Sequence, residues 1–202
     1  MDAKHEHLRI KLGISGAAET GHCGADAYDR ALELGRQVAK HDAILVTGAT
    51  TGFPLWVSMG VKEVGGIVIG FSPASSEKEH IELYNLPVEY MDVIVYTGFG
   101  FPGRDLIFTR STDGILFGCG RVGTIHEFTV AFEDKKPIGI YEGSWETDEE
   151  IKDILAKGHR ENPKITFNAD PDKLVGDVVD MVNKDKINRA SFRFQYNPSD
   201  ES

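Results

Sequence analysis

Seven short, apolar, strand-like runs alternate with helical patterns along this chain, and that alternation constrains the fold more than any other feature. Continuous apolar runs such as Val93-Ile94-Val95 are typical of strands covered on both faces, as in a parallel sheet. We therefore predict an α/β fold, a single Rossmann-like, doubly wound, mainly parallel sheet of about seven strands with helices on both faces. The predicted strands are residues 10–15, 43–47, 67–71, 93–97, 114–117, 137–141 and 165–167.

The last helical pattern carries its own start signal. Asp170 is a suitable N-cap, and Pro171 stands at the first helical position, where its missing N–H leaves no bond unmade. Apolar residues then recur at helical spacing over residues 174–182, after which the apolar rhythm is lost. We predict a Rossmann-like nucleotide-binding domain over residues 1–185 and a flexible C-terminal tail over residues 186–202.

The charge of the chain limits its partners. It has 32 acidic and 22 basic residues and a formal net charge of −10, so we expect neither nucleic acid nor an anionic membrane as a partner. An anionic small ligand would be held by local dipoles and one or two arginines instead of by the overall field. The first residues lack the apolar core of a signal peptide, and no apolar run approaches membrane-spanning length, which predicts a cytoplasmic protein.

The two cysteines, Cys23 and Cys119, offer neither a disulfide framework nor the spacing of a metal site. Cys119 could be a nucleophile near a helix N-terminus, where the pKa of a thiol falls, but no obvious base accompanies it. We expect it to be a small buried residue. The histidines also lack metal-ligand spacing, so no metal is expected.

A glycine-rich turn joins the apolar run 115–117 to a helix that we predict to begin at Thr124. The turn reads GCGRVGT over residues 118–124. Glycines between a strand and a helix let backbone N–H groups converge on an anion at the positive end of the helix dipole, a geometry that suits a phosphate. A nucleotide or phosphosugar is therefore the predicted ligand. The turn residues expected to contact it are Gly120, Arg121, Val122, Gly123 and Thr124.

Other strand ends carry glycines too, namely Gly16 after the first strand, Gly48 and Gly52 after the second, and Gly100 after the fourth. In open α/β sheets, ligands bind beyond the carboxyl ends of the strands, where the strand order reverses. We therefore predict that these glycines line one crevice. The alternative is that each only provides a tight turn, as most single glycines do. Neither a dinucleotide fingerprint nor a P-loop is present.

Thr124 and Glu127 admit two interpretations. Thr-x-x-Glu at a helix start is a capping box, in which the two side chains bond to orphan backbone N–H groups. The functional interpretation places Thr124 near a phosphate and aims Glu127 at a sugar. Gly120 and Gly123 favour function, since a cap alone does not require them.

Two arginines and a histidine near the turn can also be interpreted in more than one way. Arg104 begins the helix predicted over residues 103–111, and an arginine there is usually solvated, yet its planar fork could reach a phosphate. Arg121 could either grip a ligand or fill the pocket. His126 is expected to be a hydrogen-bonded bystander beside the site.

At these residues the chain resembles the LONELY GUY and molybdenum cofactor carrier superfamily, long misannotated as lysine decarboxylases. The resemblance covers roughly residues 8–141. That superfamily combines an arginine-bearing helix with a motif of the form PGGxGTxxE, which reads CGRVGTIHE at residues 119–127 here. The resemblance implies that Arg104 and Glu127 are the catalytic pair. The segments TGFG at 97–100 and KPIG at 136–139 look closer to the carrier branch.

The chain departs from the superfamily pattern at several positions. Cys119 replaces the proline of the motif, Arg121 replaces its second glycine, and Asp105 follows the arginine where lysine or asparagine is usual. Ala49 and Thr50 stand where glycines are common. A bulky Arg121 and a carboxylate at Asp105 could both change which anion fits.

The resemblance implies two possible functions. The main one is a nucleoside 5′-monophosphate phosphoribohydrolase, which would release base and ribose 5-phosphate. Glu127 would bind the ribose and offset the charge of an oxocarbenium-like state, and Arg104 would orient the phosphate or the base. The alternative is a noncatalytic carrier or sensor of a nucleotide or molybdenum cofactor. Nothing resembles a pyridoxal phosphate site and no resident cofactor is expected, while relatives imply a homodimer or higher homo-oligomer.

Overall fold

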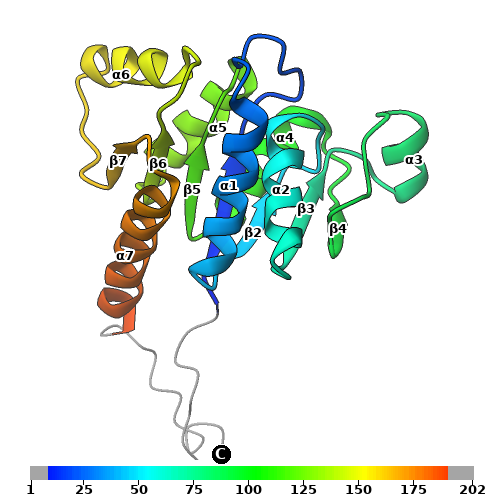
Figure 1. Cartoon of the computed structure of the whole chain (residues 1–202), viewed down its shortest axis with the longest axis horizontal. Coiled ribbons are helices and arrows are strands. Elements are labelled where there is room, and N and C mark those ends of the chain that lie inside the picture. The colour runs from blue at the N-terminus through cyan, green and yellow to red at the C-terminus, as the bar shows by residue number, and fades with distance from the viewer. Residues whose placement is uncertain (1–8, 191–202) are drawn as a thin grey trace, which may run out of the picture.

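A sheet of parallel strands forms the centre of the protein, in a computed structural model that describes residues 9–190 (Figure 1). The seven strands lie in the order β4-β3-β2-β1-β5-β6-β7, and all their pairings are parallel. The predicted fold class is confirmed, and every predicted strand bound lies within one residue of the observed one. The strands are β1 Lys11–Ser15, β2 Ile44–Thr47, β3 Val68–Ser72, β4 Val93–Tyr96, β5 Gly114–Phe117, β6 Ile138–Tyr141 and β7 Ile165–Asn168.

Helices separate consecutive strands and one more follows the last. They are α1 Ala27–Lys40, α2 Phe53–Glu63, α3 Glu77–Glu82, α4 Gly100–Ser111, α5 Val122–Glu133, α6 Thr147–Lys157 and α7 Pro171–Ala190. Asp170 caps α7 as predicted, because its Oδ1 accepts a hydrogen bond of 3.0 Å from the backbone N–H of Asp172. Residues 186–190, which belong to the predicted flexible tail, are the last residues of this helix, and residues 191–202 of that tail lie outside the described part. No helix within residues 9–190 is long and apolar enough to cross a bilayer.

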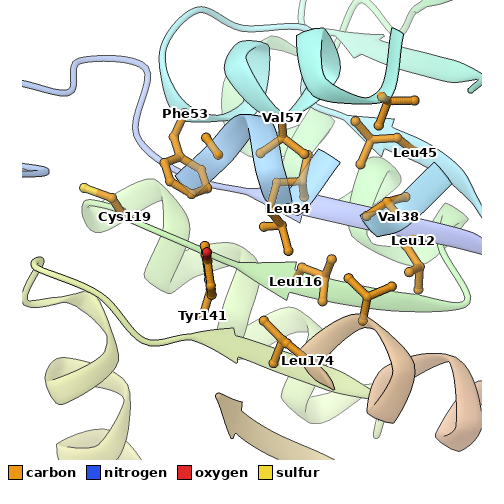
Figure 2. Packing of buried hydrophobic residues seen from close by; sticks show 14 of the residues in the cluster. Leu12, Leu34, Val38, Leu45, Phe53, Val57, Leu116, Cys119, Tyr141 and Leu174 are labelled. Carbon is orange, nitrogen blue, oxygen red and sulfur yellow. The ribbon is translucent and has the colours of Figure 1, made fainter. Parts of the chain in front are cut away.

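Both faces of the sheet are covered except at the edge strand β4, and each covering layer has its own apolar core. Val93 and Val95 on β4 are exposed, so the prediction that this apolar run is covered on both faces is wrong; β4 lies at the edge of the sheet. One core joins the sheet to α1, α2 and α7, and Leu34, Leu116 and Leu174 meet in it (Figure 2). The second core, on the α4 and α5 side, contains Phe108, Phe117 and Phe128. Strand β5 contributes Leu116 to the first core and its neighbour Phe117 to the second, so the strand is buried on both faces. This burial explains its continuous apolar sequence.

The strand order reverses between β1 and β5. From β1 the chain moves outward through β2, β3 and β4, and it then returns to add β5 on the other side of β1. Ser15 at the end of β1 is paired in register with Phe117 at the end of β5. The loops that leave these two strands diverge to opposite faces, which opens a crevice at their carboxyl ends.

A disulfide bond between Cys23 and Cys119 joins the loop after β1 to the turn after β5. Their Cα atoms lie 5.6 Å apart, although the residues are 96 positions apart in sequence. The sequence-based prediction that the two cysteines form no disulfide is therefore wrong. It failed because the pairing depends on β1 and β5 being neighbours in the sheet, and the spacing of two cysteines contains no information about that.

Removal of this disulfide should destabilise the protein. We expect the double substitution Cys23→Ser/Cys119→Ser to lower the free energy of unfolding by about 2–4 kcal/mol, because a long loop in the unfolded chain is no longer closed. Urea unfolding with and without a dithiol reductant measures the effect. The reductant should destabilise the parent protein and leave the double variant unchanged; equal stability of parent and variant would contradict this account.

Candidate functional site

A cavity of about 440 Å³ opens at the carboxyl ends of β1, β2 and β5. Eight of the residues predicted for the site line it: Gly16, Gly48, Arg104, Arg121, Val122, Gly123, Thr124 and Glu127. The remaining lining residues are Ile14, Ser15, Ala17, Ala18, Glu19, Thr50, Pro54, Phe101 and Asp105. The predicted crevice at the reversal of strand order therefore exists as a cavity with a mixed polar and apolar lining.

Gly52, Gly100 and Gly120, also predicted for the site, lie outside the cavity lining. Gly52 precedes α2 with a φ of +71°, and a Cβ there would overlap the carbonyl oxygen of Ala17. The N–H of Gly120 donates a 2.7 Å hydrogen bond to Oγ1 of Thr147, so it does not face the cavity as a free donor. Gly52 and Gly120 thus shape the turns around the site, and Gly100 is the first residue of α4, with a φ of +62°.

Helix α5 begins at Val122, two residues earlier than predicted, and this changes the roles of Thr124 and Glu127. Thr124 is the third residue of the helix, and its Oγ1 accepts a 3.3 Å hydrogen bond from the N–H of Arg121. Glu127 lies a full turn further on and accepts a hydrogen bond from the hydroxyl of Ser15 on β1. The interpretation of Thr124 and Glu127 as a capping box is therefore wrong. The carboxyl group instead joins α5 to the end of β1 at the cavity.

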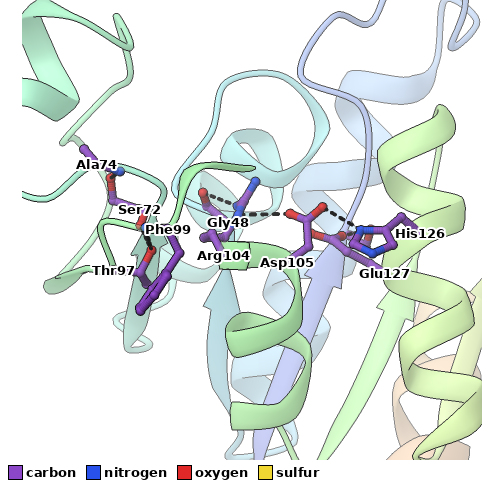
Figure 3. Close-up of polar contacts among 10 residues, drawn as sticks. Gly48, Ser72, Ala74, Thr97, Phe99, Arg104, Asp105, His126 and Glu127 are labelled. Carbon is purple, nitrogen blue, oxygen red and sulfur yellow. Dashed lines mark hydrogen bonds and ion pairs between the residues drawn. The ribbon is translucent and has the colours of Figure 1, made fainter. Parts of the chain in front are cut away.

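Arg104 is buried, with 5% of its surface exposed, and is not the solvated residue that its type favours. Its Nη1 donates a hydrogen bond to the backbone carbonyl of Gly48 at the end of β2 (Figure 3). A Cβ at Gly48 would overlap the guanidinium group, so any other residue there would force the guanidinium group to shift. The structural requirement for this glycine is thus the close approach of an arginine.

Asp105 links Arg104 to the helix opposite. One carboxylate oxygen lies 3.1 Å from Nε of Arg104, and the other lies 3.1 Å from Nδ1 of His126 on α5 (Figure 3). His126 is thus hydrogen-bonded beside the site, as predicted. The sequence indicated Asp105 as a departure from a motif that could change which anion fits, and it gave no role to Ser15. The position of Ser15 at a strand end just before Gly16 was the available signal.

Glu127 is the group whose ionisation is most perturbed in the cavity. Burial is the largest effect and raises its pKa, the charge of Arg104 lowers it, and the carboxylate of Asp105 raises it again, giving a pKa of about 8. The ordinary value is 4.5. Glu127 is therefore mostly protonated at neutral pH, and it can both accept the Ser15 hydrogen bond and donate one of its own.

Arg121 stands at the mouth of the cavity, where it forms an ion pair with Glu19 from the loop after β1. Both side chains are more than half exposed. Arg121 thus neither fills the pocket nor is buried in it. Its ion pair is solvated and weak, so an anion entering the cavity can compete with Glu19 for the guanidinium group.

The first turn of α5 lies at the cavity wall. The amides of Val122, Gly123 and Thr124 belong to a helix start, where N–H groups have no carbonyl four residues earlier in the helix to bond to. The positive end of the helix dipole points the same way, which favours a phosphate or another small anion. A cation is disfavoured here, since the guanidinium of Arg104 already neutralises the carboxylate of Asp105.

Comparison with known proteins identifies the group to which this architecture is similar. A model of the SLOG cluster4 family matches residues 9–175. An uncharacterized protein from Archaeoglobus fulgidus is 26% identical over 129 residues, which are 64% of this chain and 78% of that protein.

Two solved structures have similar folds. The X-ray structure of TM1055 superposes with a TM-score of 0.70 at 25% identity, covering 87% of this chain and 99% of that one. The molybdenum cofactor carrier protein of Chlamydomonas reinhardtii superposes with a TM-score of 0.69 at 23% identity, covering 87% of this chain and 99% of that one. The resemblance found in the sequence is confirmed at the level of the superfamily.

We expect Gly48→Ala to displace Arg104 from the cavity wall. The new methyl group overlaps the guanidinium, so the unfolding free energy should fall by about 1–3 kcal/mol. Gly21→Ala is the matched control, since a Cβ there has no neighbour within 4 Å. Thermal or urea unfolding compares the two variants. Equal stabilities would show that Arg104 does not need the space at Gly48.

The raised pKa of Glu127 predicts a specific dependence of stability on pH. Because its pKa rises from 4.5 to about 8 on folding, the stabilisation from its proton is complete below pH 4.5 and is lost as the pH rises through about 8. Urea unfolding of the parent and of Glu127→Gln at a series of pH values measures this pH-dependent stabilisation. The parent should lose stability relative to the variant, by up to about 1.4 kcal/mol per pH unit. If the unfolding free energies of the parent and the variant changed equally with pH, the raised pKa of Glu127 would be contradicted.

Proposed function

The chain belongs to the SLOG cluster4 family, and from that premise we propose that it binds an intact nucleotide-like phosphorylated ligand as a carrier or sensor. One observation carries this proposal. The two residues expected to act in catalysis, Arg104 and Glu127, are both held by the protein itself, the first by Gly48 and Asp105 and the second by Ser15. Because both side chains are held in this way, they support a role in the cavity wall more than a role in a reaction.

The start of α5 is the proposed phosphate site. Val122, Gly123 and Thr124 supply N–H groups at the cavity wall, and Arg121 supplies a charge at its mouth. This local arrangement is needed because the chain as a whole carries a net charge of −10 and repels anions. The rest of the ligand would extend toward Phe101 and Pro54, which provide apolar surface for a base or another ring.

The protonation state of Glu127 supports binding more than hydrolysis. An oxocarbenium-like transition state is stabilised by an ionised carboxylate. With a pKa of about 8, Glu127 is mostly neutral at neutral pH and would offer little of that stabilisation. A neutral carboxyl group is instead a good hydrogen-bond partner for a sugar hydroxyl.

The similarity to a carrier protein supports the same proposal. The Chlamydomonas protein is named as a carrier of molybdenum cofactor. For this chain we propose the same general role toward a phosphorylated ring compound, with molybdenum cofactor or a nucleotide as cargo.

A second candidate function, nucleotide hydrolysis, has one observation in its favour. Arg104 and Glu127 line the same cavity. In that reaction the neutral Glu127 would protonate the departing base, since a carboxyl group with a raised pKa is suited to act as a general acid. Activity would then fall as the pH rises through about 8.

The homodimer predicted from the sequence remains a proposal. Val93 and Val95 on the edge strand β4 are exposed, as is Phe99 before α4. Apolar side chains on an edge strand support a surface that a second copy could cover.

Incubation with AMP tests the proposal directly. We expect native mass spectrometry to detect AMP bound intact, and chromatography to detect no released adenine. Accumulation of adenine and ribose 5-phosphate would contradict the carrier proposal. If Glu127→Gln then slowed that release by about 10²–10³, the second candidate would replace the first.

The ion pair at the cavity mouth provides matched variants. Arg121→Gln removes a charge-assisted hydrogen bond and should weaken AMP binding roughly tenfold or more. Glu19→Gln removes the competing carboxylate and should strengthen binding by a few-fold. Isothermal titration calorimetry at low ionic strength measures both. Equal affinities for the parent and both variants would place the phosphate away from this mouth.

A further inference from the structure

Three potential metal ligands gather beside the cavity, where the disulfide joins two loops. Nε2 of His22 lies 3.5 Å from the sulfur of Cys119 and 4.0 Å from the sulfur of Cys23. All three ligand atoms lie within 4.8 Å of one another, and within residues 9–190 no other group of three such side chains meets this geometry.

We propose that reduction of the Cys23–Cys119 disulfide converts this cluster into a binding site for one thiophilic cation, Zn²⁺, held by His22 and the two thiolates. Thiolate sulfur and imidazole nitrogen are the ligands that zinc prefers. Three protein ligands leave the fourth position to water. The inference does not rest on the proposed nucleotide function, because the cluster lies outside the lining of that cavity.

The existing geometry is close to that of a metal site. With Zn–S bonds of about 2.3 Å and Zn–N bonds of about 2.0–2.1 Å in a tetrahedron, a sulfur and a nitrogen ligand lie roughly 3.6 Å apart. The separation between His22 Nε2 and Cys119 Sγ is 3.5 Å. The His22 ring would have to turn so that Nε2 faces the sulfurs and not the carbonyl of Gly120, and breaking the S–S bond frees the two sulfurs to separate.

The burial pattern also fits a cation. Both cysteines are fully buried, whereas His22 is exposed and gives the ion a side from which to enter. Two thiolates without water would be costly, and a divalent cation neutralises both. The positive charge of the zinc ion therefore offsets the cost of burying the two thiolates that form when it binds.

The chemistry balances as a thiol–disulfide exchange followed by metal binding. A small dithiol reductant breaks the S–S bond, gives two electrons and two protons to the cysteines, and becomes a disulfide itself. Zn²⁺ then displaces the two thiol protons to solvent. In the oxidised form Nε2–H of His22 donates to the carbonyl of Gly120 at 3.0 Å, and that proton moves to Nδ1 when Nε2 binds the cation.

The redox state would act on the nearby turn. Cys119 and Gly120 directly precede Arg121, which caps α5 at the cavity mouth. The oxidised form fixes this turn to the loop after β1 through a covalent bond, and the zinc form would fix it through a longer bridge.

Cobalt provides a spectroscopic probe for the experiment. The full chain is prepared with His5→Ala and His7→Ala, since these histidines could bind the probe independently. It is reduced with a dithiol, freed of reductant without oxygen and titrated with Co²⁺. We expect a single equivalent of Co²⁺ to produce thiolate-to-cobalt charge-transfer absorption, Zn²⁺ to displace it, and the oxidised protein to bind none.

Variants assign the ligands. His22→Ala should weaken Co²⁺ binding by at least about tenfold. Removing a residue that only hydrogen-bonds to a metal ligand already lowers metal affinity by about that factor, and His22 is itself a proposed ligand. His159→Ala, at an exposed histidine after α6, should leave the titration unchanged. The proposal is overturned if the reduced protein binds no more Co²⁺ than the oxidised one, or if His22→Ala binds like the parent. The proposal is also overturned if the reduced protein loses the circular dichroism spectrum of the folded state. That result would show that the disulfide is needed for the fold and has a structural role only.

Discussion

The guanidinium of Arg104 lies against the carbonyl of Gly48, and the polar half of the cavity is organised around that contact. Burial of an arginine requires partners for its charge, and Asp105 provides one at 3.1 Å. The carboxylate of Asp105 is then close enough to raise the pKa of Glu127, which helps to keep the acid protonated. The charge of Arg104 acts the other way and lowers that pKa, so burial, the largest cause, is what keeps Glu127 protonated.

The sheet topology explains why these groups meet. Gly48 follows β2, Ser15 ends β1, and Glu127 belongs to the helix after β5, and these three strands are neighbours in the sheet. The disulfide joins two of the same connections by a covalent bond. Backbone donors at the start of α5, an internally neutralised arginine and a protonated acid together make a site suited to holding a ligand.

The sequence predicted the fold almost completely, because the apolar runs of a doubly covered parallel sheet are visible without any knowledge of contacts. It also predicted Arg104 and Glu127 at one cavity. It missed the start of α5, since the first two helical residues, Val122 and Gly123, resemble the glycine turn before them. The disulfide and the link through Asp105 could not be predicted, because both depend on which strands and helices are adjacent.

The central claim is that Glu127 is a neutral acid within a binding cavity, and nuclear magnetic resonance can measure this directly. The chain is labelled with ¹³C at the glutamate side-chain carboxyl, and Glu127→Gln identifies the resonance. The account predicts a titration midpoint near 8. A midpoint near the ordinary value of 4.5 would contradict it, and would restore an ionised carboxylate able to act in hydrolysis.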